Sequence, residues 1–358
     1  MRKLAAGGIP ASTRYQQETS RRKEMNPSRQ PLRIKVFFVL ILAGLMTAAG
    51  IRPADCAPPA PPSVLASGLQ GTLGSTVGPD GALYVVEGVL GQVARVDPRT
   101  GQISTFASGL PKTLSAIGIG GPIDVAFIGR TAYVLVTLVS PDIGGSDIDG
   151  IYRVDGPDQF TVIADIGQFN LNNPPTIRFP ISVHTGLQFA LQPYQGGFLV
   201  TDGHLNRVLS VTLDGKISVA EAFNDVVPTG LTIGSGNTVF MAEAGPVPHL
   251  AQNGKIVKFR PNSPVEEVAS GASLLVGVKF AGGHLFALSQ GPGVPGAPPG
   301  SPAQPNSGAL VRANSDGTFT FLVDHINLPG SFNFIGNTAY IVTLTGEVLQ
   351  VDHVFGPF

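Results

Sequence analysis

The sequence lacks the residues and spacings on which most recognisable active sites depend. Its single cysteine, Cys56, has no partner for a disulfide bond and cannot supply a Cys/His metal site. No H-x-H, H-E-x-x-H, G-x-S-x-G, P-loop or Rossmann glycine pattern is present. The sequence therefore predicts no catalytic set, and ordinary surface or turn positions are expected for five of the histidines: His204, His249, His284, His325 and His353.

Long helices are missing as well. Between Ser63 and Asp352 no stretch has the apolar periodicity of an amphipathic helix of useful length. The 46 glycines and 31 prolines suit many tight turns, and a hydrophobic content of 43% is enough for a large core. These features predict one large all-β domain over residues 63–358.

What the sequence contains instead is a repeated unit of short strands. Residues 78–110 read GPDGALYVVEGVLGQVARVDPRTGQISTFASGL, in which Asp80-Gly81 and Thr100-Gly101 supply hairpin turns between apolar or alternating runs. Weaker copies follow at intervals of about 40 to 65 residues, the length of one four-stranded blade with loop insertions. The second strand of each copy is expected at Leu83-Tyr84-Val85, Ala132-Tyr133-Val134, Phe198-Leu199-Val200, Val239-Phe240-Met241, Leu285-Phe286-Ala287 and Ala339-Tyr340-Ile341.

The sixth copy has no fourth strand, because the chain ends soon after Val351. Residues 63–69, SVLASGL, copy residues 104–110, STFASGL, which include most of the fourth strand of the first copy. We therefore predict a six-bladed β-propeller in which the N-terminal strand completes the last blade and removes an exposed sheet edge. A pair of β-sandwiches is the alternative, since regularly spaced strands suit both folds.

The N-terminal region is typical of an export signal. Residues 1–35 hold nine of the 23 Lys and Arg residues, and an apolar run, short for a membrane span, follows over residues 36–49. We interpret residues 1–57 as a signal peptide with its processing region and residues 58–62 as a Pro-rich spacer, which predicts a secreted or periplasmic protein. A retained N-terminal anchor and lipidation at Cys56 are the alternatives.

Charge restricts the class of partner. Residues 58–358 keep 13 of the 23 basic and 21 of the 24 acidic residues, a net charge of −8. This acidic balance argues against nucleic acid and favours cations, neutral small molecules, glycans or proteins. After removal of the signal, no integral membrane segment is expected.

Long insertions are predicted to lie on one face of the propeller. In an up-and-down blade, the loop entering the first strand and the loop between the second and third strands open on the same side. The long loops are all of these two kinds, and loops of such length are usually functional or disordered. They comprise residues 138–149, 169–180, 246–253 and 291–307.

Polar residues at the same strand ends are the candidates for a site. Asp124, His184 and Thr229 fall near the starts of first strands, closest to the axis, and are the candidate ligand-binding residues, with His184 as a possible acid/base. Glu87, Asp202 and Glu243 end second strands and are the candidate ligands of Ca²⁺ or another hard cation. The structural alternative is that each accepts hydrogen bonds from the next turn or pairs with a residue such as Arg207.

The order of these motifs resembles a known family. The stretch DGHLNRV at residues 202–208, followed by TLDGKI, is similar to the NHL-repeat pattern. The segments VLASGL, GPDGALYVVEG and GALVRANSDGTFTFLVDHI, with a Pro/Gly-rich insertion before the last, resemble the ScyD/ScyE family of secreted NHL-like propellers. The resemblance implies an exported bacterial six-bladed propeller, with namesakes in the gene cluster for the pigment scytonemin, and implies no catalytic residues.

Two functions follow from these observations. The first is a non-enzymatic binding or scaffold module that holds a small molecule, glycan or protein on its loop-rich face. The alternative is a metal-dependent hydrolase resembling the six-bladed lactonases, with a cation in the channel bound by Glu87, Asp202 and Glu243. That family's Asn ligands have no clear counterparts in this sequence.

Overall fold

The computed structural model describes residues 59–115, 118–177, 183–298 and 300–355. The chain divides into two units, Met1–Pro53 and Ala54–Phe358, and every described residue belongs to the second. The predicted signal and processing region, including Cys56, lies outside the described residues.

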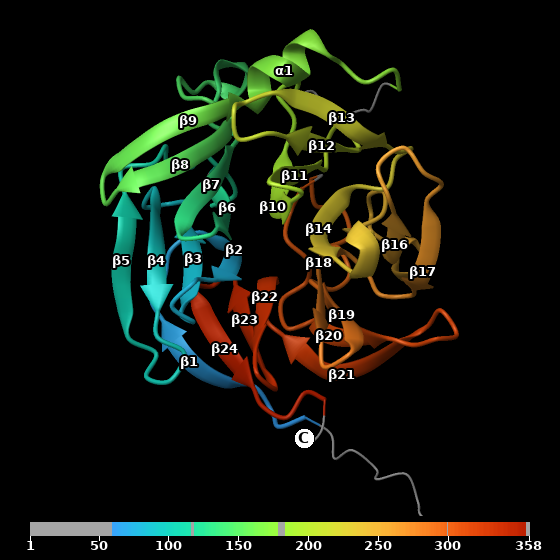
Figure 1. The fold of residues 1–358 in the computed structure, drawn as a ribbon. Helices are drawn as coiled ribbons and strands as arrows, with labels where there is room; N and C mark the ends of the chain where they lie inside the picture. Colours follow the sequence, from blue (N-terminus) through green and yellow to red (C-terminus); the bar gives the residue numbers. More distant parts are fainter. Residues whose placement is uncertain (1–58, 116–117, 178–182, 299, 356–358) are drawn as a thin grey trace, which may run out of the picture. The chain divides into compact units, whose positions relative to one another are not determined.

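Six four-stranded antiparallel sheets form the blades of a propeller (Figure 1). This confirms the predicted fold and excludes the sandwich alternative. Blades 1 to 3 comprise β2 (Thr72–Val77), β3 (Leu83–Glu87), β4 (Gln92–Val96) and β5 (Ile103–Ser108); β6 (Gly121–Ile128), β7 (Thr131–Thr137), β8 (Gly150–Gly156) and β9 (Gln159–Asp165); and β10 (Gln188–Tyr194), β11 (Gly197–Asp202), β12 (Arg207–Val211) and β13 (Ile217–Ala222). Blades 4 to 6 comprise β14 (Pro228–Ile233), β15 (Val239–Glu243), β16 (Lys255–Phe259) and β17 (Glu266–Ser270); β18 (Leu275–Ala281), β19 (His284–Ser289), β20 (Gly308–Ala313) and β21 (Phe319–Ile326); and β22 (Pro329–Ile335), β23 (Thr338–Thr343), β24 (Glu347–Val351) and β1 (Ser63–Ser67).

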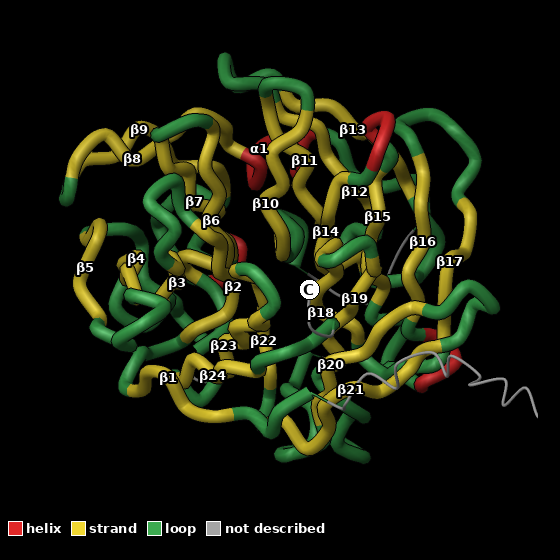
Figure 2. Tube along the Cα trace, turned by 60° about the horizontal axis from the view of Figure 1, so that its bottom comes forward, coloured by secondary structure: helices red, strands yellow, loops and turns green. Residues whose placement is uncertain are grey.

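The first strand of each blade lies at the centre of the ring. Figure 2 shows β2, β6, β10, β14, β18 and β22 gathered around the axis. Every predicted second strand lies within the second strand of its blade. The side chains on the inner strands therefore decide what the axis of the propeller can hold.

Short helices occupy some of the loops. Helix α1 (Ile166–Asn172) lies partly in the insertion predicted as a loop; Asp165 caps its N-terminus by accepting a hydrogen bond from Gln168 N, and Ile166 is fully buried. The 3₁₀ turns are Pro141–Ile143, Ser235–Asn237 and Ala251–Asn253. No helix in the described part of the chain is long and apolar enough to cross a membrane.

The first and last strands of the chain pair to close the ring. β1 is antiparallel to β24, with Ser63 opposite Gln350 and Ser67 opposite Glu347, and the two strands lie side by side in Figure 1. Behind them, Ala66 and Leu69 pack in one apolar cluster with residues of blades 1 and 6, including Val85 and Val348. The closure predicted from the copied SGL segment is thus confirmed.

Aromatic contacts join successive blades. Blade 1 meets blade 2 through Tyr84 and Phe127, whose ring centroids lie 4.8 Å apart in an edge-to-face arrangement. Equivalent pairs connect the following blades: Tyr133–Phe198, Phe223–Phe259, Phe240–Phe280 and Phe286–Phe334. Between blades 6 and 1 the Tyr340 hydroxyl donates to Pro98 O at 3.3 Å. These contacts bury the blade faces that no single repeat buries alone.

We expect truncation of the closure cluster to destabilise the whole domain. Leu69 is only 5% exposed, so Leu69→Ala should lower the free energy of unfolding by about 2 to 4 kcal/mol. Val64 on the same segment is 57% exposed, so Val64→Ala is the matched control and should leave the melting temperature nearly unchanged. Equal melting temperatures for the two variants would contradict a stabilising role for this closure.

Candidate functional site

An apolar cavity of about 140 Å³ lies on the axis at the loop-rich face. We call it the vestibule. Residues near the starts of the first strands and residues that follow the second strands both line it, so the two kinds of loop meet on one face as predicted. Its apolar walls come from all six blades: Leu73, Ile119, Leu187, Phe189, Val227, Pro228, Ala244, Val247, Leu274, Val276, Pro302 and Leu344.

Few polar groups reach the vestibule. His204, His249, Thr229, Gln290 and Ser301 belong to its wall. The Thr229 hydroxyl contacts Ala242 O at 3.0 Å and Leu275 O at 2.7 Å, which fixes this candidate ligand-binding residue between blades 4 and 5. Burial lowers the pKa of His204, and the negative charge of Asp202 acts in the opposite direction.

Deeper along the axis is a cavity of about 50 Å³, smaller and more polar than the vestibule, which we call the channel. Phe189 and Val276 line both cavities, so the channel adjoins the vestibule. Glycines let the inner strands approach: a Cβ at Gly230 would lie 2.6 Å from the Cα of Gly277, too close for any side chain. The close approach keeps the channel narrow.

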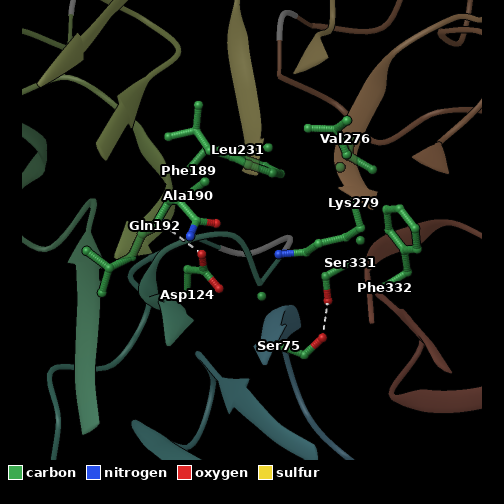
Figure 3. Close-up of a pocket in the computed structure, with 16 residues that line it drawn as sticks. Ser75, Asp124, Phe189, Ala190, Gln192, Leu231, Val276, Lys279, Ser331 and Phe332 are labelled. Carbon is green, nitrogen blue, oxygen red and sulfur yellow. Dashed lines mark hydrogen bonds between the residues drawn. The ribbon is translucent and has the colours of Figure 1, made fainter. Parts of the chain in front are cut away.

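Asp124 and Lys279 face each other across the channel (Figure 3). They come from the inner strands β6 and β18, and no ion pair of 4.0 Å or less joins these two described residues. Burial raises the pKa of Asp124 to about 6, although backbone hydrogen bonds and the charge of Lys279 oppose the shift. Burial also lowers the pKa of Lys279, against the charge of Asp124. Desolvation therefore weakens the charged form of both groups.

The side of the channel between Asp124 and Lys279, formed by blades 1 and 6, carries hydroxyl groups that are already paired. Ser75 Oγ and Ser331 Oγ lie 2.7 Å apart, which joins blades 1 and 6 (Figure 3). Asn333 donates to Ser75 Oγ at 2.9 Å. This wall is polar, but its hydrogen bonds are made within the protein.

Asp202 is the centre of a buried network away from the channel. Its Oδ2 accepts from Asn170 Nδ2 at 2.6 Å and from Gln188 Nε2 at 3.1 Å, and its Oδ1 accepts from Leu205 N at 3.0 Å. Arg207 donates to Asn170 Oδ1 at 2.8 Å, so the side-chain amide of Asn170 links Arg207 to Asp202. The side chain is fully buried, and these donors correspond to the structural alternative for this candidate metal ligand.

Glu87 has a similar environment at the end of β3. It is 2% exposed and accepts from Gln70 N at 2.9 Å and from Gln92 Nε2 at 2.6 Å. Both of its oxygens therefore have protein donors, one from the segment between β1 and β2 and one from β4.

Glu243 differs from the other two predicted metal ligands. It is 5% exposed and lies opposite Lys255, whose ammonium pairs with Glu267 at 2.6 Å. Burial raises its pKa from the ordinary 4.5 to about 7; the charge of Lys255 opposes the shift, and that of Glu267 adds to it.

The structure does not bring the predicted metal ligands together. Glu87, Asp202 and Glu243 lie on blades 1, 3 and 4. Among the described residues, no group of three or more His, Cys, Asp or Glu side chains is placed to hold a metal ion. Metal binding by these residues stays a prediction without an assembled ligand set in the described part.

The predicted ligand-binding residues are also separated. Asp124 lines the channel and Thr229 the vestibule, whereas His184 is exposed, and its backbone hydrogen-bonds to Asp142. Sequence reasoning missed Lys279, although a lone lysine in the apolar run LLVGVKFA was a usable signal. It also missed that His204 and His249, expected in turns, would line a cavity.

Comparison with known proteins identifies the fold. The sequence matches no protein-family model and no curated protein, so the resemblance to the ScyD/ScyE family stays a prediction. A gluconolactonase from Xanthomonas campestris is similar, with a TM-score of 0.56, 13% identity and coverage of 84% of this chain and 96% of that one. The aldose sugar dehydrogenase of Streptomyces coelicolor in its PQQ-bound form has a TM-score of 0.52, 15% identity and coverage of 83% and 99%.

A lyase structure shares the fold as well. A catalytically inactive virginiamycin B lyase from Staphylococcus aureus, solved with quinupristin, has a TM-score of 0.50, 14% identity and coverage of 81% of this chain and 98% of that one. At these identities the likeness establishes the propeller fold shared with lactonases and lyases, and the chemistry has to be argued from the site.

We expect the stability of the protein to depend on Glu243 as the pH changes. Because its pKa is raised, Glu243 of the folded protein holds a proton that the unfolded chain releases. The contribution of this group to the free energy of unfolding is complete below pH 4.5 and is lost as the pH rises to about 7. Glu243→Gln should remove this loss and be more stable than the wild type at about pH 8, by up to about 3 kcal/mol.

The measurement is the melting temperature of both proteins between about pH 5 and pH 8. Asp124, whose pKa is also raised, is present in both, so its contribution cancels. Glu266→Gln is the control, because Glu266 lies on the same blade, has a side chain that is 66% exposed and pairs with Lys258 instead of Lys255. Parallel profiles for wild type and Glu243→Gln would contradict the assignment.

Proposed function

We propose that this protein is an exported binding module that holds a small apolar molecule, or the apolar part of one, in the vestibule. The observation that carries the proposal is the apolar lining contributed by all six blades at the mouth of the axis. Concave, mainly apolar cavities with a few polar groups are the usual form of small-molecule sites. Catalysis is not part of this proposal.

The size and chemistry of the vestibule select among the partners expected from the sequence. Its volume of about 140 Å³ is close to that of apolar cavities that bind benzene. A glycan needs hydrogen-bond partners for many hydroxyl groups, and the wall offers few. The walls therefore favour a small apolar ligand over a sugar.

Export is the part of the proposal that rests on the sequence. The basic and then apolar N-terminal region is typical of a signal peptide, and residues 58–358 have a net charge of −8. This signal-like region, together with the resemblance to secreted ScyD/ScyE propellers, supports a secreted or periplasmic location.

The metal-dependent hydrolase is the alternative function. Its support is the propeller fold shared with gluconolactonases, of which the Xanthomonas campestris structure is one example. Against it, Glu87 and Asp202 already accept hydrogen bonds from protein donors, and the described residues offer no cluster of metal-binding side chains. The binding module is therefore the function that we put forward.

We expect toluene to bind the wild-type protein and to lose affinity when the vestibule is filled. Leu344 lies in the wall, so Leu344→Trp should weaken toluene binding by about tenfold or more. Leu213 is 42% exposed and outside the wall, so Leu213→Trp is the matched control. Ligand-observed NMR titration measures both, and equal affinity in the two variants would refute the location.

We also expect Ca²⁺ to leave the stability unchanged. A cation bound only by the folded state raises the melting temperature, so values in EDTA and in excess Ca²⁺ should agree within about 1 °C. A rise of several degrees that disappears in Glu87→Gln or Asp202→Asn would instead favour the hydrolase.

A further inference from the structure

We propose that the ligand carries a neutral hydrogen-bonding group at one end, and that this group enters the channel and lies between Asp124 and Lys279. The inference rests on the proposed function, because it assumes that the apolar part of the ligand occupies the vestibule. It specifies the ligand class as a small amphiphile with an uncharged polar head, such as an alcohol or a primary amide.

The two cavities are consecutive along the same strands. On β18, Leu274 precedes the strand and lines the vestibule, Val276 lines both cavities, and Lys279 lines the channel. On β10, Phe189 lines both cavities and Gln192 the channel. A ligand whose apolar body fills the vestibule therefore directs its inner end toward the polar pair.

The channel groups have hydrogen-bonding capacity left over. Asp124 Oδ2 accepts from Leu191 N at 2.8 Å and Oδ1 accepts from Val125 N at 2.9 Å, one donor for each oxygen, while a carboxylate has about four lone-pair sites. Within the described part of the chain, no group accepts a hydrogen bond from the Lys279 ammonium. A hydroxyl or amide between the two residues would donate to Asp124 and accept from Lys279.

The charge balance selects a neutral head group. The pair has no net charge whether both residues are ionised or both are neutral. A charged head would leave an uncompensated charge in a narrow channel whose two charged side chains are half-buried. Ser75 and Ser331 are bonded to each other at 2.7 Å, so they do not supply that compensation.

A matched ligand series tests the inference on the full-length wild-type protein. Toluene, benzyl alcohol, benzoate and benzylammonium share one ring and one carbon and differ in the group on that carbon. At neutral pH we expect benzyl alcohol to bind about tenfold more tightly than toluene, because its hydroxyl bonds to charged partners, and both ions to bind more weakly than benzyl alcohol.

Variants of the pair identify the residues responsible. Asp124→Leu/Lys279→Met removes both hydrogen-bonding groups, keeps the channel without net charge, and should abolish the preference for benzyl alcohol while leaving toluene affinity within about twofold. Lys258→Met is the control, because Lys258 is an exposed residue of β16 that pairs with Glu266 at 3.0 Å. The wild-type series remains decisive if the double variant does not fold.

The outcomes separate the two proposals. Failure of both toluene and benzyl alcohol to bind would refute the vestibule as a ligand site. Toluene binding without a preference for benzyl alcohol would overturn only the inference about the head group. The head-group inference would also be overturned if benzoate or benzylammonium bound more tightly than benzyl alcohol. It would equally be overturned if the double variant kept the preference for benzyl alcohol over toluene.

Discussion

The pairing of β1 with β24 is the constraint on which the rest of the structure depends. Each four-stranded blade has two apolar faces, and a linear array would leave one face and one sheet edge exposed at each end. Hydrogen bonds between the first and last strands place blade 6 against blade 1, where Ala66, Leu69 and Val348 share one cluster. Closure also brings the six inner strands around a common axis, and the channel and vestibule exist only because that ring is complete.

Inside this ring, polar groups fall into two kinds. Asp202 accepts hydrogen bonds from two side-chain amides and a neighbouring backbone N–H, so it joins helix α1 to blade 3 and has little hydrogen-bonding capacity left for a ligand. Asp124 and Lys279 lie on the inner strands β6 and β18, where they face a cavity and each other without an ion pair. Unused hydrogen-bonding capacity in a cavity, more than burial or acidity, distinguishes a binding residue from a structural one.

The fold was predictable because its determinants are local and repeated. The D-G turns, the period-2 strands and the copied SGL segment predicted all six blades and the closure. The roles of the acids were not predictable, since Glu87, Asp202 and Glu243 occupy equivalent strand ends and differ only in which donors the neighbouring segments bring to them. Asn170 reaches Asp202 from helix α1, a segment predicted as a loop, so the sequence pattern around Asp202 contained no trace of that contact. Lys279 was missed for a related reason, because its partner Asp124 lies on another blade.

The position of the cavities on the propeller axis also explains how one fold accommodates different chemistry. A gluconolactonase, a sugar dehydrogenase and a lyase share the propeller with this chain at 13 to 15% identity, so most positions of the scaffold tolerate substitution. The positions that face the axis are few, because six strands contribute only a few inward side chains each. In this protein several of these axial positions are glycines, which keep the channel narrow. The Ser75 and Ser331 hydroxyl groups on the channel wall are paired with each other. Asp124 and Lys279 face each other without such a pairing, and a binding site built on them has a polar end with no net charge below an apolar wall.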